Sequence, residues 1–214
     1  MPGRSVREEK VEATREAILA AAERLFAENG VYNISNRQIS TAAGQGNTAA
    51  VNYHFGNKTD LVLAIARRHT EQIERIRARQ VARTRGSTVL RDWVTCMVRP
   101  LTEHLDALGS PTWYARFNAQ VSADPALYDA VVPEIAASPT LRSLLDGLNA
   151  CLPGLPDDVK AVRGVMARHL IVQMCVERER ALATGAPLAH PTWADLASSL
   201  IDALTGLWSA PVTP

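Results

Sequence analysis

The sequence predicts an all-α protein with a small N-terminal head and a larger helical body. Of its 214 residues, 47% are hydrophobic and only 5% aromatic, and alanine and leucine recur in runs that favour helices over strands. Apolar residues also recur three and four positions apart. We expect residues 1–57 to form an arm and a head with a helix-turn-helix, and residues 58–214 to form the body, with helix 58–85 connecting them.

The first predicted helix runs from about Val11 to Asn29 and stops at Gly30. Its inward face repeats at helical spacing and is built from Ile18, Ala22, Leu25 and Phe26. We expect a loose arm before it, carrying Arg4 and Arg7, which could reach the minor groove of DNA or have no role.

Two short helices follow. Ser35 can cap the first of them, with Gln38 three residues later completing a capping box, and Gly44 ends it after little more than two turns. Asn47 or Thr48 then caps the second, which ends near residue 54.

The next predicted helix begins after Asn57 and ends before Gly86. Its apolar stripe consists of Leu61, Ile65, His69, Ile73 and Ile76.

The rest of the chain continues as helices with capping residues and prolines between them, and Pro100 interrupts one helix. The expected helix starts are Ser87, Ser110-Pro111, Asp124-Pro125, Ser138-Pro139, Asp157 and Thr192.

Two helices as short as those in residues 35–55 cannot each bury a face alone, so they must pack on the first helix as a three-helix unit. In that geometry the second helix of the pair projects outward, with a width that suits the DNA major groove. Its exposed residues are small or polar, which suits contacts with base edges and phosphates. They are Asn47, Thr48, Ala49, Asn52, Tyr53 and His54.

Two strings, ISTAAG at residues 39–44 and VNYHFGNKTDL at residues 51–61, closely resemble the signature of the TetR family of bacterial regulators. The resemblance covers about residues 11–65. It implies that residues of this region contact the DNA backbone and groove edge, the bases, and the phosphates. The implied DNA-binding set is Ser35, Arg37, Gln45, Asn47, Thr48, Ala49, Asn52, Tyr53, His54 and Lys58.

The turn from Gln45 to Thr48 is one residue longer than the family's usual turn, so the resemblance does not fix the register from Gln45 to Ala49. Other roles also remain open for two of the aromatic rings. Tyr53 could be a packing aromatic, and His54 could be a solvated histidine at a helix end.

The resemblance also implies a homodimer on a palindromic operator, because one head reads only half a site and two heads must lie about one helical turn apart, ~34–36 Å. Two apolar stripes on the last two helices are the expected interface, although they could instead pack within one protomer. The residues expected at this interface are Val162, Met166, Leu170, Met174, Leu196, Leu200, Leu204 and Leu207, with Gln173 and Ile201 on the same stripes.

A small-molecule effector is the remaining partner that the resemblance implies. Side chains around the bend expected at Pro100 could line its pocket, or could equally be ordinary core. They are His69, Trp93, Met97, Trp113, Tyr114 and Phe117. Nothing in the sequence identifies the effector, and a largely apolar or weakly polar compound is our expectation.

Other classes of protein find less support. The net charge is only +1, but it is unevenly distributed along the chain. Lys and Arg minus Asp and Glu give 14 − 9 = +5 for residues 1–85 and 9 − 13 = −4 for residues 86–214.

No enzyme motif occurs, so we expect no catalytic residue, metal site or cofactor. We expect buried free thiols at Cys96, Cys151 and Cys175, and a cytoplasmic protein with neither a secretory signal nor a membrane partner. A helical protein-interaction module, or a DNA-binding regulator without a ligand, is the alternative.

Overall fold

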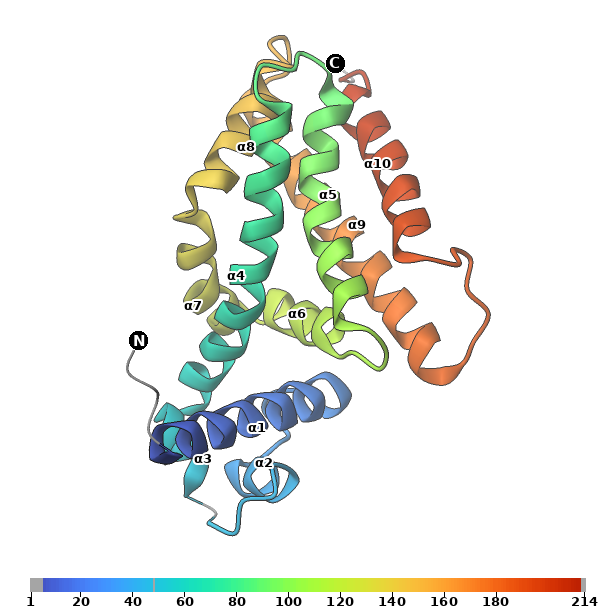
Figure 1. Ribbon diagram of the computed structural model, residues 1–214. Helices are drawn as coiled ribbons and strands as arrows, with labels where there is room; N and C mark the ends of the chain where they lie inside the picture. Colours follow the sequence, from blue (N-terminus) through green and yellow to red (C-terminus); the bar gives the residue numbers. More distant parts are fainter. Residues whose placement is uncertain (1–5, 48, 213–214) are drawn as a thin grey trace. The chain divides into compact units, whose positions relative to one another are not determined.

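The computed structural model describes residues 6–47 and 49–212, and every regular element in that part of the chain is a helix (Figure 1). The all-α prediction is therefore confirmed. The helices are α1 (Val6–Asn29), α2 (Asn36–Ala42), α3 (Ala50–Phe55), α4 (Lys58–Thr84), α5 (Leu90–Leu108), α6 (Tyr114–Ala123), α7 (Pro125–Ala136), α8 (Pro139–Ala150), α9 (Asp157–Thr184) and α10 (Trp193–Ser209).

Helix α1 begins five residues before the predicted start at Val11. Arg7 therefore lies in a helix, and the expected arm is wrong at that position, whereas Arg4 lies outside the described residues. Glu8 and Glu9 occupy the first turn, where negative charge interacts favourably with the helix dipole. This favourable interaction helps the helix begin before the first residue of its apolar face.

Several predicted caps are confirmed because their signals are local. Ser35 and Gln38 form the capping box at α2, and Thr192 forms a second one with Asp195 at α10. Ser138 caps α8 by accepting a hydrogen bond from a backbone N–H. These ends could be predicted because each cap lies within three residues of its partner.

Two other predicted starts are wrong. Helix α3 begins at Ala50 after an N-cap residue, Ala49, that makes no side-chain capping bond. Asn47 instead closes a turn one step earlier, where its Oδ1 accepts a hydrogen bond from the Ala49 N–H at 2.9 Å. Ser110 and Pro111 lie in the loop before α6, which starts only at Tyr114.

The described chain forms two compact units. The first combines residues up to Arg68 with Arg116–Val131. Phe26 of α1 stacks on Phe117 of α6 with ring centroids 6.4 Å apart, and the Gln120 amide donates to the Phe26 carbonyl at 2.7 Å. The N-terminal head therefore buries its core partly against a segment about ninety residues further along the chain.

The second unit combines His69–Ala115 with Val132–Pro214. Within it, α5 packs against α10 and α8 (Figure 1). Gly147 of α8 lies so close to Trp93 of α5 that a Cβ atom at this glycine would be 2.3 Å from the indole ring. Arg163 of α9 donates to the Trp208 carbonyl at 2.8 Å and so satisfies an acceptor at the end of α10.

Helix α4 runs without a break through the boundary between the two units at residues 68 and 69. The predicted domain boundary between residues 57 and 58 is a different division, and it stays a prediction. In the part of the chain that the structure describes, no helix is both long enough and apolar enough to cross a membrane.

Candidate nucleic-acid interface

A glycine turn separates α2 from α3. Gly44 has a φ of +69°, in the left-handed region that favours glycine, and the next residue, Gln45, donates its backbone N–H to the Ser40 carbonyl at 2.9 Å. The Gln45 side-chain amide donates to the Ala43 carbonyl. The end of α2 is thus held by backbone and side-chain bonds before the chain enters α3.

The inner faces of α2 and α3 are apolar and buried. Ile39 and Val51 have no exposed surface and Phe55 is 7% exposed, while α2 packs against both α1 and α3. Burial of such side chains contributes about 1.5–3 kcal/mol each. This packing determines which face of α3 points outward.

The predicted DNA-binding residues mostly lie at the surface of the first unit. Six are exposed, namely Ser35, Arg37, Asn47, Ala49, Asn52 and Tyr53. Three are half-buried, namely Gln45, His54 and Lys58, and Thr48 lies outside the described residues. Tyr53 is 82% exposed and meets the His54 ring edge-on at 5.0 Å, so it is not a core aromatic in this chain. Their roles in DNA binding stay predictions.

Asn52 is held in place by a residue that the sequence did not single out. The Asn36 amide of α2 donates to Asn52 Oδ1 of α3 at 2.6 Å. This bond spans the two helices and uses the Asn52 oxygen, so the Asn52 Nδ2 protons stay available to another acceptor. An amide oriented in this way can accept and donate side by side, which is how asparagine reads the edge of adenine.

Arg15 of α1 fixes the C-terminal end of α3. Its guanidinium donates to the His54 carbonyl at 3.1 Å and lies over the Phe55 ring, 4.3 Å from the centroid. A cation at a helix C-terminus interacts favourably with the helix dipole. The sequence signal for this contact was weak, because Arg15 is one of many charged residues on α1.

Lys58 lies in the first turn of α4, as the resemblance implies, but it already has one partner. Its ammonium donates to the Ile34 carbonyl at 2.6 Å, which ties the start of α4 to the loop before α2. An ammonium carries three protons, so two remain for a phosphate. Asn57 caps α4 by accepting from the Asp60 N–H at 2.9 Å, as predicted.

The six residues predicted to line a ligand pocket separate into different environments. The Trp93 indole is buried and donates to the Ser87 carbonyl at 3.0 Å, and Phe117 packs on Phe26 in the first unit. Met97 and Trp113 are half-buried. One cavity of the second unit is lined by none of the six, and their role in ligand binding stays a prediction.

His69 and Tyr114 do come together, with a third residue that the sequence did not indicate. The His69 and Tyr114 rings stack with centroids 3.8 Å apart, and His69 Nδ1 shares a hydrogen bond of 2.8 Å with His104 Nε2. All three are buried. Local sequence patterns do not indicate His104, because it lies 35 residues from His69.

The residues predicted for the dimer interface also divide. On α10, Leu196, Leu200 and Leu204 are at most 3% exposed, on a helix that packs against α5 and α9 of the same protomer. Ile201 is buried as well, and Leu207 is half-buried. On α9, in contrast, several apolar side chains are exposed over three turns, namely Val162, Val165, Met166 and Leu170, with Gln173 exposed beside them and Met174 half-buried.

Comparisons with known proteins agree with this geometry. A family profile described as "Bacterial regulatory proteins, tetR family" matches residues 18–65. The HTH-type transcriptional dual regulator CecR of Shigella flexneri is 40% identical over 78 residues, which cover 31% of this chain and 34% of CecR. The matching region thus spans about a third of that relative's length.

Solved structures resemble nearly the whole fold. The fatty acid degradation regulator FadR from Bacillus halodurans has a TM-score of 0.62 at 14% identity, covering 94% of this chain and 97% of its own. The multidrug binding protein EbrR, solved in complex with ethidium, has a TM-score of 0.51 at 22% identity, covering 91% and 97%.

The short helix pair, its glycine turn and its exposed polar face define a helix-turn-helix protein. More particularly, residues 18–65 match the profile of the TetR family of bacterial regulatory proteins.

Proposed function

We propose that this chain is a transcription regulator that binds a specific DNA sequence through α2, α3 and the first turn of α4. One observation carries the proposal. The only side chains of α3 that point outward from its buried face are polar or small and include Asn52 and Tyr53, on a helix fixed from behind by Arg15. A rigid, solvated helix face with amide and hydroxyl groups suits the major groove.

We propose two kinds of contact with DNA, one to a base and the others to phosphates. Asn52, oriented by Asn36, reads a base edge, whereas Tyr53, His54 and Lys58 contact phosphates. Phosphate contacts provide affinity and orientation, and the base contact provides the sequence preference.

We propose that two copies bind a palindromic operator as a homodimer. The exposed apolar face of α9 supports this proposal, because Val162, Met166 and Leu170 share one side of the helix and leave substantial apolar surface in water. The α10 leucines contribute indirectly, since their burial against α5 and α9 supports the helix that carries this face.

We further propose that the protein is a repressor, released from its operator by a small-molecule ligand. The ligand part of this proposal is supported by the similar fold of the multidrug binding protein EbrR, which was solved with ethidium. Helix α4 carries Lys58 at its first turn and the buried His69 further along, so a ligand that shifts α4 would displace a phosphate contact. Such coupling needs a difference in ligand affinity of about 1–3 kcal/mol between the two states. We assign the protein to the cytoplasm and to no enzyme class.

The salt dependence of duplex binding tests the DNA-binding proposal. Each phosphate contact contributes about 0.9 to the slope of log K against log salt concentration. We expect a steep slope for the unaltered protein, weaker binding by Tyr53→Phe and Lys58→Ala, and unchanged binding by Glu71→Ala, which alters an exposed charge on α4. A flat salt response, unaffected by these variants, would instead indicate a protein-interaction module.

Sedimentation velocity tests the dimer. Met166→Arg places a charge in the exposed face of α9 and should shift the protein to a monomer. Ala82→Arg makes a similar change on an exposed position of α4 and should leave the dimer intact. A Met166→Arg protein that sediments as a dimer would exclude this face as the interface.

A further inference from the structure

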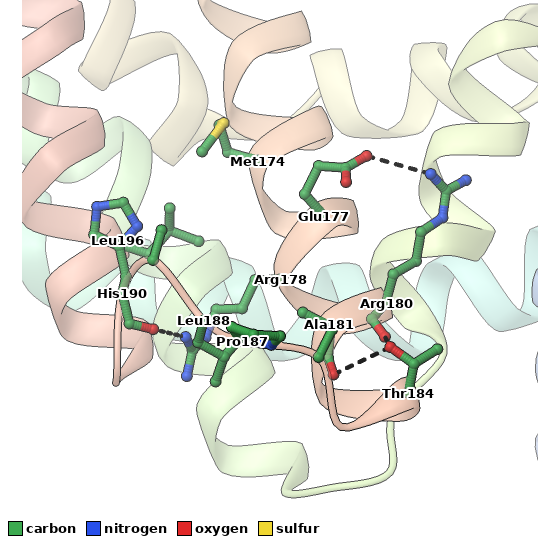
Figure 2. Close-up of a pocket in the computed structure, with 12 residues that line it drawn as sticks. Met174, Glu177, Arg178, Arg180, Ala181, Thr184, Pro187, Leu188, His190 and Leu196 are labelled. Carbon is green, nitrogen blue, oxygen red and sulfur yellow. Dashed lines mark hydrogen bonds and ion pairs between the residues drawn. The ribbon is translucent and has the colours of Figure 1, made fainter.

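A cavity of about 380 Å³ lies in the second unit between the last turns of α9, the segment 186–190 and the start of α10 (Figure 2). We call it the α9–α10 cavity. It is separate from the predicted ligand pocket and from the DNA-binding face of α3. Its size is at the lower end of the range found for small-molecule sites, about 300–1,000 Å³.

The walls of this cavity are mostly apolar. The apolar residues that line it include Met174, Ala181, Pro187, Leu188 and Leu196. Around the same cavity, Arg180 pairs with Glu177 at 3.3 Å, so these two charges largely neutralise each other. An apolar part of a ligand would therefore be favoured in this space.

Arg178 is the one lining residue that combines a charge with deep burial, since it is only 8% exposed. Its Nη1 donates to the His190 carbonyl (Figure 2). Its Nη2 donates to the Pro191 carbonyl at 2.9 Å, and the two bonds hold the loop before α10. Its Nε is buried and has no hydrogen-bond partner among the described residues. A buried donor without a partner is rare in proteins and unfavourable.

The charge of Arg178 is also incompletely balanced. Burial lowers its pKa, while the charges of Asp106 and Asp195 act in the opposite direction, yet neither carboxylate forms an ion pair with it. Asp195 is engaged at the N-terminus of α10, where its carboxylate accepts from Thr192. Arg178 thus places a positive charge, with no carboxylate within ion-pair distance, in the wall of an apolar cavity.

From this combination we infer that the α9–α10 cavity binds a compact carboxylate with an apolar body, whose carboxylate pairs with Arg178 and whose body contacts Leu188 and Leu196. A guanidinium matches a carboxylate geometrically through paired N–H donors. The inference does not depend on DNA binding, so it can fail or succeed independently of the proposed function.

Titration calorimetry of the full-length protein with octanoate tests the assignment, with octan-1-ol as the uncharged probe of equal chain length. We expect saturable binding of octanoate and binding of octan-1-ol at least about tenfold weaker, the loss that follows from removing a charge-assisted bond. Equal binding of the two probes, or no saturable octanoate binding, would overturn the inference.

Two matched pairs of variants locate the site. Arg178→Lys keeps the positive charge but removes the paired guanidinium donors, together with the bonds to the His190 and Pro191 carbonyls, and it should weaken octanoate binding about tenfold or more, whereas Arg180→Lys at the same cavity should not. Ala181→Phe fills the cavity without altering any bond of Arg178 and should abolish binding, whereas Ala183→Phe, on an exposed position outside the cavity, should not. If the Ala181→Phe protein folds and binds octanoate normally, the ligand lies elsewhere and the assignment is wrong.

Discussion

The hydrogen bond between Asn36 and Asn52 leads to a specific prediction about sequence reading. If Asn52 contacts a base, Asn52→Ala should weaken binding to the cognate operator by about 1–3 kcal/mol, the value of a good amide-to-base contact. Asn36 makes no base contact in this account, because it acts by orienting Asn52 through a 2.6 Å bond. Asn36→Ala should therefore weaken cognate binding by about 0.5–1.5 kcal/mol, the net contribution of one such hydrogen bond.

The measurement is a double-mutant cycle by fluorescence anisotropy, on the cognate duplex and on a scrambled duplex at the same salt concentration. The effect of Asn36→Ala should nearly vanish when Asn52 is already alanine, because the bond no longer exists. Neither substitution should change binding to the scrambled duplex. Alanine suits the first turn of α2, which offsets part of the lost hydrogen bond, so Asn36→Ala should lower the melting temperature only slightly.

Two results would refute this reasoning. The first is an Asn36→Ala effect of equal size in both backgrounds, because additivity would mean that the two residues act separately. The second is an equal loss of affinity for cognate and scrambled duplexes, which would show that Asn52 contacts the DNA backbone instead of a base.

Three further predictions concern affinity, packing and pH. Lys58→Ala should lower the salt slope of DNA binding by about 0.9, and an unchanged slope would remove Lys58 from the phosphate contacts. Gly147→Ala should lower the free energy of unfolding in urea by about 1–3 kcal/mol because its Cβ would overlap Trp93, whereas Gly164→Ala, in ordinary contact only, should raise or preserve it. Burial raises the pKa of Cys175 to about 12. The unfolded thiol ionises first, so the free energy of unfolding should fall above pH 9, by about 1.4 kcal/mol per pH unit from this group, and Cys175→Ala should make that fall shallower.

The parts of the fold that could be predicted from sequence depend on neighbouring residues. The capping box of Ser35 and Gln38 and the glycine turn at Gly44 each involve partners a few positions apart, and all were found. The start of α3 was predicted wrongly. The Asn47 side chain accepts a hydrogen bond from the Ala49 N–H in a turn, and the sequence of this turn resembles that of a helix cap.

Contacts between distant segments could not be predicted from a single sequence. Arg15 reaches the end of α3 across 39 positions, and Gln120 reaches the end of α1 across 94. Nothing in the local pattern distinguishes these residues from other polar residues on the same helices. The candidate face of α3 was therefore predictable in its position but not in the side chains that hold it.

Apolar stripes on long helices were similarly ambiguous. Leu196 of α10 and Met166 of α9 both recur at helical spacing, yet the first is buried within the protomer and the second is half exposed. Periodicity shows which face is apolar, but the neighbouring helices decide whether that face is covered. Of these two helices, α9 has the exposed apolar stripe that a second copy could cover.

Selection of bound sequences from a random duplex pool, using the full-length protein, tests the central claim most directly. The account predicts recovery of an inverted repeat whose half-sites lie about one helical turn, ~10 base pairs, apart, and loss of that preference with Asn52→Ala. Recovery of single, unpaired half-sites, or of no preferred sequence even at low salt, would contradict it.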